Sequence, residues 1–124
     1  MANIWQRNRG YNKYGNTKFE WRGEKFDSQA EWQYYMILAD RQRKGEIKDL
    51  QRQVVFELQP TFKSESGKTI RAIKYIADFV YYETGTGKRH IVDVKGSKIM
   101  ETDVFKLKAK IMAYQGNEIE EVFI

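Results

Sequence analysis

Two apolar, strand-length segments of the chain, YIADFVYY and HIVDV, each carry an aspartate in their interior. Side chains alternate between the two faces of a strand, so Asp78 has apolar neighbours on both faces and its strand is expected to be buried on both sides. These neighbours are Ile76 and Val80 on one face, and Ala77 and Phe79 on the other. Asp93 interrupts the second segment in the same way, and Lys95 is expected on the same face as Asp93. A buried carboxylate is costly without a partner, so each aspartate needs one.

The turn between the two segments, residues 84–87 (TGTG), sets how the strands pair. Counting outward from the middle of this turn pairs Val80 with Ile91 and Asp78 with Asp93. Like charges facing each other on neighbouring strands are destabilising, and burial raises the pKa of a carboxyl group further. A hard divalent cation such as Mg²⁺ or Mn²⁺ resolves the conflict, because it binds carboxylate, carbonyl and water oxygens. A bulge at the glycines would instead shift the register by one residue and turn Asp78 to the other face.

The ammonium of Lys95 is suited to work beside such a metal. It is expected to orient or polarise a water molecule, or to stabilise charge that develops on a phosphate. A simpler interpretation pairs Asp93 with Lys95 at the end of the strand and Asp78 with a nearby lysine. Both interpretations are compatible with the pattern.

Glu31 is a further candidate for the same site, with its own structural alternative. It follows Ser28 by three residues, the spacing of a capping box, which explains the glutamate without any chemistry. Glu31 also shares one helix face with Tyr35 and Leu38, so its carboxylate is expected to point toward the interior and a site on the sheet.

The hydrophobic pattern predicts a single α/β (α+β) domain over residues 1–124, with the main elements in the order helix, strand, strand, strand, helix, strand. The expected elements are a short strand pair within residues 17–26, a helix over 28–44, strands within 54–62, 70–82 and 90–94, a helix over 102–114, and an edge strand over 119–124. Residues 1–16 show no period and are expected to form a basic, aromatic N-terminal arm.

Composition narrows the possible partners and metals. The net charge is +5, which favours a polyanionic partner. The chain has no cysteine and one histidine, which excludes disulfides, thiolate sites and a multi-histidine zinc cluster, so any metal must be held by oxygen. Charges interrupt every apolar run before it reaches the length of a membrane span or a signal peptide, so a cytoplasmic protein is expected.

Basic residues suggest where DNA would bind. The arm and the residues after it mix cations with aromatic residues, a combination that neutralises phosphates and stacks on unpaired bases. The cations expected to contact DNA are Arg7, Arg9, Lys13, Lys18 and, just after the second aspartate segment, Lys98. The alternative is a solvated tail whose aromatic side chains pack on the body.

Four segments in order, FDSQAEWQYY, IRAIKYIADFVYYE, HIVDVKGSK and TDVFKLKAKIM, resemble the PD-(D/E)XK nuclease superfamily. More narrowly they resemble a phage-encoded, Holliday-junction-resolvase-like family, from about Asn12 to the C-terminus. Ala77 stands where the superfamily motif has proline, a departure that the superfamily tolerates. The resemblance implies a restriction-endonuclease-like core, in which a mixed central sheet is flanked by helices.

The resemblance also implies roles for particular residues. Asp78, Asp93 and the backbone carbonyl of Val94 would bind Mg²⁺, with Mn²⁺ able to substitute, while Glu31 would support the metal or its water. Lys95 would assist the attacking water. A homodimer is implied as well, because a four-way junction must be cut on two strands.

The leading hypothesis is therefore a Mg²⁺-dependent endonuclease that acts on branched DNA. The alternatives are cleavage of duplex or flap DNA by the same site, and a nucleic-acid-binding module without catalysis. The segment GTGK at residues 85–88 lacks the full spacing of a phosphate-binding loop, so no nucleotide cofactor is expected. The single histidine, His90, is interpreted as a structural side chain.

Overall fold

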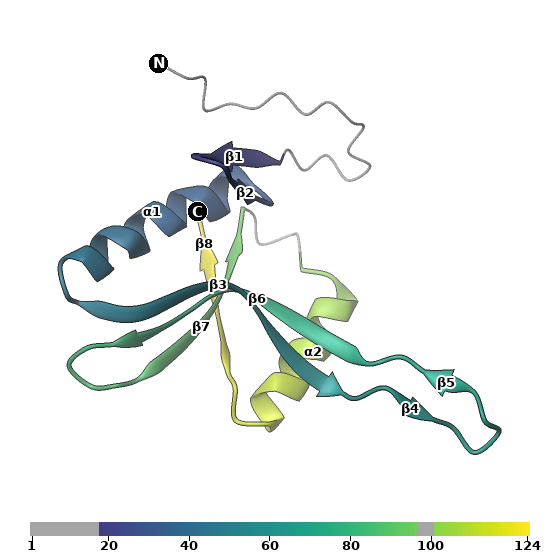
Figure 1. The fold of residues 1–124 in the computed structure, drawn as a ribbon. Helices are drawn as coiled ribbons and strands as arrows, with labels where there is room; N and C mark the ends of the chain where they lie inside the picture. The colour runs from purple at the N-terminus through teal and green to yellow at the C-terminus, as the bar shows by residue number, and fades with distance from the viewer. Residues whose placement is uncertain (1–17, 97–100) are drawn as a thin grey trace.

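A computed structural model describes residues 18–96 and 101–124. These residues form an α+β fold with two helices and a central four-stranded mixed sheet (Figure 1). The elements are β1 (Phe19–Trp21), β2 (Glu24–Phe26), α1 (Gln29–Arg43), β3 (Ile47–Gln59), β4 (Phe62–Lys63), β5 (Thr69–Ile70), β6 (Ile73–Glu83), β7 (Arg89–Lys95), α2 (Asp103–Tyr114) and β8 (Ile119–Phe123). The predicted order of the main elements is confirmed.

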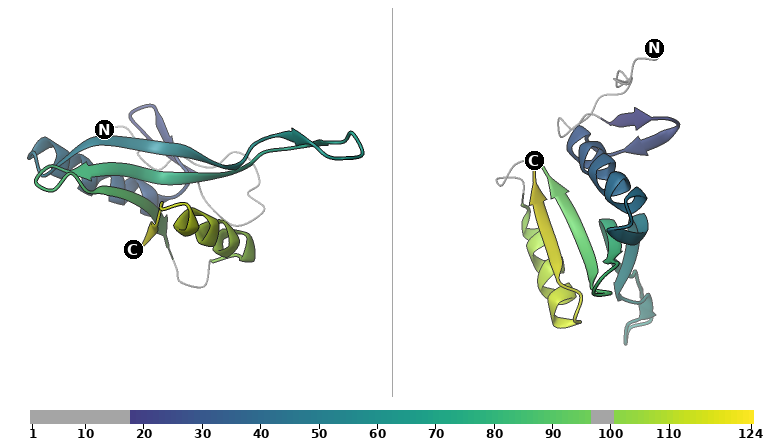
Figure 2. Two further views of the ribbon diagram at one scale, coloured as in Figure 1. Left: turned by 90° about the horizontal axis from the view of Figure 1, so that it is seen from below. Right: turned by 90° about the vertical axis from the view of Figure 1, so that its left-hand side faces the viewer.

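The central sheet has the strand order β3-β6-β7-β8. Pairing is antiparallel from β3 to β7 and parallel between β7 and β8, so α2 serves as the crossover that a parallel pair requires. Each helix covers one face of the sheet (Figure 2). Leu38 of α1 packs against Phe79 and Val92, whereas Met112 of α2 packs against Val80 and Ile91 on the opposite face.

Helix α1 begins as its sequence predicts. Ser28 is the N-cap, and its hydroxyl accepts a hydrogen bond from the Glu31 backbone N–H at 3.1 Å. The helix ends before Gly45, whose φ of +83° is the left-handed conformation that commonly closes a helix. Within the described residues, neither helix is both long and apolar enough to span a membrane.

The first strand of the sheet is longer at its start than predicted. Strand β3 begins at Ile47 rather than near Val54, because pairing with β6 extends over the polar residues that precede Val54. At the other end, β3 and β6 continue beyond the body as β4 and β5, which pair through Phe62 and Ile70. The predicted strand over residues 70–82 is accordingly divided between β5 and β6.

The hairpin register between β6 and β7 agrees with the prediction only in part. Val80 pairs with Ile91 as expected, but the ladder ends at Phe79 and Val92. The predicted pairing of Asp78 directly with Asp93 is therefore wrong. The two strands part at this point, while β7 continues to pair with β8 as far as Lys95.

Side-chain alternation breaks at Asp78, which corrects the predicted faces of this strand. Ala77 packs in the cluster beside α2, but Phe79 packs in the cluster beside α1, so the two do not share a face. Ile76 is 50% exposed, so the strand is not buried on both sides there. Strand β3 is irregular at the position opposite Asp78, where Gln53 has a φ of +54°, a left-handed conformation that is uncommon for a side chain of this type.

Candidate metal centre

Asp78 lies where β6 and β7 separate, and it holds the two strands together at that point. Its carboxylate accepts a hydrogen bond from the Val94 backbone N–H, with Oδ2 at 2.8 Å from the nitrogen. This side-chain bond stands in for the ladder bond that parting strands cannot make. It brings Asp78 beside the backbone of the residue that follows Asp93.

Asp93 and Lys95 lie on the α2 face of β7, as their spacing predicts. The Lys95 ammonium donates a hydrogen bond to Asp93 Oδ2, and the Tyr75 hydroxyl donates to Asp93 Oδ1 at 3.1 Å. The ammonium also lies 3.7 Å from the ring centroid of Phe105 in α2, a cation–π contact. The ion pair is largely removed from solvent, with 11% of the Lys95 side chain and 13% of the Asp93 side chain exposed.

The simpler interpretation of the two aspartates accounts for one of them only. Asp93 does pair with Lys95. Asp78, by contrast, forms no ion pair with a lysine or arginine of residues 18–96 and 101–124. The charged side chains that act on its pKa are other carboxylates, those of Glu31, Asp93 and Asp27, and all three raise it.

Glu31 points from α1 into the interior, as its helix face predicts, and it is only 2% exposed. Oε1 accepts a hydrogen bond from the Asp27 backbone N–H at 3.1 Å, and Oε2 accepts one from the Gln53 side-chain amide at 2.7 Å. Ser28 caps the helix, but the Glu31 carboxylate bonds the residue before the cap and not the cap itself, so the box is incomplete.

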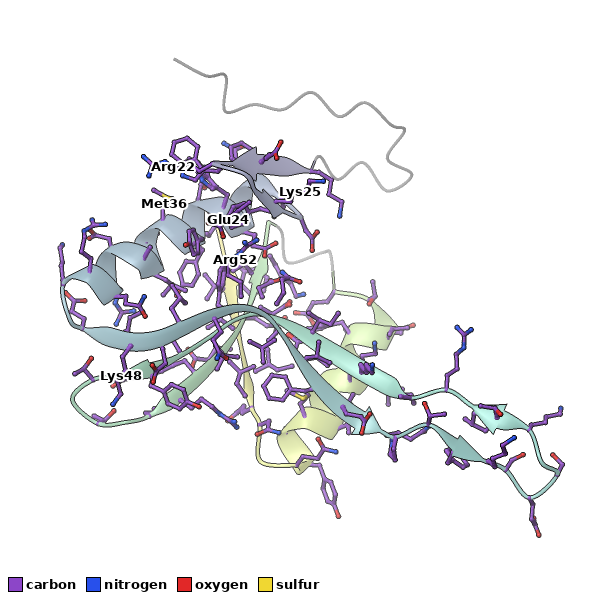
Figure 3. The ribbon with its side chains drawn as sticks, viewed as in Figure 1. Arg22, Glu24, Lys25, Met36, Lys48 and Arg52 are labelled. Carbon is purple, nitrogen blue, oxygen red and sulfur yellow. The ribbon has the colours of Figure 1, made fainter. Side chains whose placement is uncertain are left out.

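The β1–β2 hairpin that carries Asp27 at its end is fixed to the sheet by one arginine. Arg52 of β3 forms an ion pair with Glu24 at 2.9 Å and donates to the Lys25 backbone carbonyl at 2.5 Å (Figure 3). Its guanidinium lies 3.8 Å from the ring centroid of Phe26. This anchor places the Asp27 backbone N–H against Glu31.

Burial and mutual repulsion raise the pKa values of carboxyl groups in this region. Burial, and next the charge of Glu31, raise the pKa of Asp78 to about 8, although the hydrogen bond from Val94 opposes this rise. Burial likewise raises the pKa of Glu31, although the hydrogen bond from the Asp27 backbone N–H opposes this rise. The pKa of the Tyr75 hydroxyl is raised by burial and by the charge of Asp93. Carboxylates from α1, β6 and β7 therefore share one region and destabilise one another when ionised.

The donors in this region fit Mg²⁺ or Mn²⁺ in kind. Glu31, Asp78 and Asp93 supply oxygen ligands, and the Val94 backbone carbonyl belongs to the residue that bonds Asp78. Three ionised carboxylates and one ammonium, that of Lys95, leave two negative charges for a divalent cation to neutralise. In the part of the chain that the structure describes, no three His, Asp or Glu side chains are gathered closely enough to hold a metal ion. Metal binding would therefore replace some of the hydrogen bonds that the Glu31, Asp78 and Asp93 carboxylates accept in this structure.

Two residues of this region were not predicted from the sequence. Gln53 lies in a polar stretch, QRQ, in which nothing marks it, and its role becomes visible only when β3 lies opposite β6 and beneath α1. Tyr75 alternates with Ala77 and therefore resembles an ordinary core residue. Its only distinguishing signal is a hydroxyl in an apolar strand, since a buried tyrosine usually bonds a polar partner.

Of the five residues predicted to contact DNA, Lys18 lies within the described part of the chain. This residue is exposed and pairs with Asp27 at 2.9 Å, which puts it near Glu31 at the start of α1. The other four positions, Arg7, Arg9, Lys13 and Lys98, lie outside the described residues.

His90 occupies a separate part of the sheet. Its two ring nitrogens contact the carboxylates of Glu83 and Glu120, and its ring stacks on Tyr81 with the centroids 4.8 Å apart. It links β6, β7 and β8, which agrees with the structural role inferred from the sequence.

The chain belongs to the DUF1064 family, described as proteins of unknown function, whose model matches residues 11–124. No curated protein and no solved structure matches the chain.

The raised pKa of Asp78 predicts how the stability of the metal-free protein depends on pH. The unfolded chain releases this proton near the ordinary value of 3.8, whereas the folded protein retains it up to about pH 8, so the free energy of unfolding falls as pH rises through this window. A pKa shift is worth about 1.4 kcal/mol per unit when it is expressed in full. Because the site is partly exposed, we expect a smaller total fall in the free energy of unfolding, about 2 to 4 kcal/mol.

Urea unfolding in EDTA at about pH 5 and about pH 8.5 measures this fall. Asp78→Asn removes the ionisable group and should flatten the dependence. The matched control is Asp40→Asn, at an exposed acid in the last turns of α1 that pairs with Arg43 and Lys44. Equal pH dependence in the wild type and Asp78→Asn would contradict the assignment.

Proposed function

We propose that this protein is a Mg²⁺-dependent endonuclease that hydrolyses DNA phosphodiester bonds, with a four-way junction as its preferred substrate. The observation that carries the proposal is the position of Asp78, a half-buried carboxyl group at the end of a strand ladder, beside Glu31 and the Asp93–Lys95 pair. Carboxylates rarely gather in this way for stability alone, since each raises the cost of ionising the others.

In this proposal Asp78, Asp93 and the Val94 carbonyl hold the metal, and Glu31 supports the metal or its water. A bound Mg²⁺ would supply Lewis acidity toward the phosphate and make a coordinated water easier to deprotonate. The Lys95 ammonium would orient the attacking water or stabilise charge that develops on the phosphate. Its contacts with Asp93 and Phe105 favour this role, because they restrict a flexible side chain to one region.

Junction specificity and a homodimer come from the resemblance of the four sequence segments to the resolvase-like family. One active site in each of two protomers would cut the two strands that resolution requires. DNA contacts at Arg7, Arg9, Lys13, Lys18 and Lys98, together with a place in the cytoplasm, that of the host cell if the protein is phage-encoded, belong to the same proposal. Cleavage of duplex or flap DNA by the same residues is the alternative within this class.

A nucleic-acid-binding module without catalysis is the second candidate. It is favoured by the ion pair between Asp93 and Lys95, which accounts for both side chains without a metal. A metal-dependent activity is the property that separates the two candidates.

Asp93→Asn tests catalysis directly. The amide can still accept the Tyr75 hydrogen bond but is a poor metal ligand, so we expect metal-dependent junction cleavage to fall by about 10³-fold, with junction binding retained. The measurement is single-turnover cleavage of a labelled four-way junction in Mg²⁺ and in Mn²⁺. Asp40→Asn is the control for an aspartate outside the site. Absence of cleavage by the wild type in both metals would instead favour the binding module.

Substrate comparison tests the junction specificity separately. Rates on four-way junctions, flaps and linear duplex of the same sequence should be highest on the junction. Equal rates on all three would contradict a resolvase while leaving the nuclease proposal intact.

Gln53→Ala tests the support that β3 gives to the site. Loss of the amide leaves Oε2 of Glu31 without its hydrogen bond, and groups that hold metal-binding carboxylates typically contribute about 10 to 100-fold in metal affinity or activity. We expect a loss of that size in the apparent Mg²⁺ affinity for cleavage. Gln51→Ala is the matched control, because Gln51 is an exposed glutamine on the same strand, as Gln53 is, but does not donate to Glu31. Equal Mg²⁺ dependence in the two variants would show that Gln53 does not act on the site.

A further inference from the structure

The hairpin of β3 and β6 projects beyond the rest of the fold. We call residues 59–73, which include β4 and β5, the ribbon. Figures 1 and 2 show it extending past both helices, at the end of the sheet opposite the β6–β7 turn. All four residues of β4 and β5 are exposed, and neither strand belongs to the central sheet. An element with so little burial is not explained by the packing of the body.

The net charge of the ribbon is positive. It carries three cations, Lys63, Lys68 and Arg71, and one acid, Glu65. In the described part of the chain, none of the three cations takes part in an ion pair. Projecting, unpaired cations are suited to a polyanion, because phosphates release condensed counterions when such groups bind them.

The two faces of the ribbon differ in character. Lys63 pairs with Thr69, and Phe62 pairs with Ile70. Arg71 follows β5 directly and is exposed. Residues directly opposite each other in a ladder share a face, so Phe62 and Ile70 lie on one face of the ribbon and Lys63 and Thr69 on the other. That face is basic and hydroxylated, whereas the other is apolar, with Phe62 46% and Ile70 36% exposed.

We propose that the ribbon contacts DNA by lying in the major groove of a duplex, with Lys63 and Arg71 on the phosphates of that duplex. A two-stranded ribbon fits the width of this groove. Asp78 comes eight positions after Ile70, which is about 26 Å along an extended strand, or about eight base pairs of a duplex at 3.4 Å each. The ribbon is thus long enough to contact the same DNA molecule that reaches the metal centre. This inference rests on the proposed function, since it assumes a DNA substrate there.

The test measures how DNA affinity depends on salt. Each phosphate contact contributes about 0.9 to the slope of log affinity against log salt, so Lys63→Gln with Arg71→Gln should lower the slope by about 1.8 and weaken binding about tenfold or more at 0.1 M salt. The substrate is a four-way junction with arms of about 15 base pairs, in EDTA to prevent cleavage. Cleavage of saturated substrate in Mg²⁺ should remain at the wild-type rate.

The matched control removes the same charge from the opposite end of the sheet. Lys48 and Lys88 are both exposed, and neither forms an ion pair with another described residue (Figure 3 labels Lys48). Lys48→Gln with Lys88→Gln should leave the slope near the wild-type value. A slope lowered equally by both double variants would show a general charge effect and overturn the assignment of the ribbon.

Other outcomes separate this inference from the proposed function. If the wild type cleaves junctions and Asp93→Asn does not, while the ribbon variant keeps the wild-type affinity and slope, only the DNA-contacting role of the ribbon is refuted. If the wild type binds no DNA, both fail. If Phe62→Ser with Ile70→Ser converts a dimer to a monomer while the charge variant binds DNA normally, the ribbon is a protein interface and the inference is overturned.

Discussion

The hydrogen bond from the Val94 backbone N–H to the Asp78 carboxylate is the interaction on which the site depends. It occurs where the β6–β7 ladder ends, so a side chain joins two strands that their backbones no longer join. Without it, the Asp78 carboxylate would accept no hydrogen bond from residues 18–96 and 101–124 to offset its burial. With it, a carboxylate is held between two strands and directed toward a region that already contains Glu31 and Asp93.

This arrangement has a cost that the rest of the fold must offset. The left-handed backbone of Gln53 is unfavourable by about 1 to 2 kcal/mol. The burial of Asp78 and its repulsion by Glu31, which raise its pKa, add to this cost. The cores on both faces of the sheet stabilise the fold despite it. Local strain combined with buried charge is typical of functional sites, which is why this break in the sheet carries the proposed metal centre.

Much of the fold follows from local sequence patterns. The Ser28 cap and the apolar face with Glu31 and Leu38 predict α1, and the glycine-containing turn predicts the pairing of Val80 with Ile91. The start of β3 was not predicted, because its polar residues form a strand only through their pairing with β6. Local pattern is informative where one element determines its own geometry.

The candidate site was predicted less completely than the fold. The shared face of Asp93 and Lys95 follows from strand periodicity, and the inward direction of Glu31 follows from helix periodicity. The direct pairing of Asp78 with Asp93 was wrong, because counting from a turn assumes a regular ladder. The irregularity arises in a neighbouring strand, at Gln53, and beneath a helix, which is tertiary information that neither segment contains.

The central claim is that the carboxylates at this break bind a divalent metal, and an anomalous difference map of crystals grown with Mn²⁺ tests it most directly. The account predicts a manganese peak at about 2.2 Å from oxygens of Asp78, Asp93 and the Val94 carbonyl, with Glu31 bound to the ion or to one of its waters. A map with no manganese at these residues, or with the Asp93–Lys95 ion pair unchanged and the metal elsewhere, would contradict it.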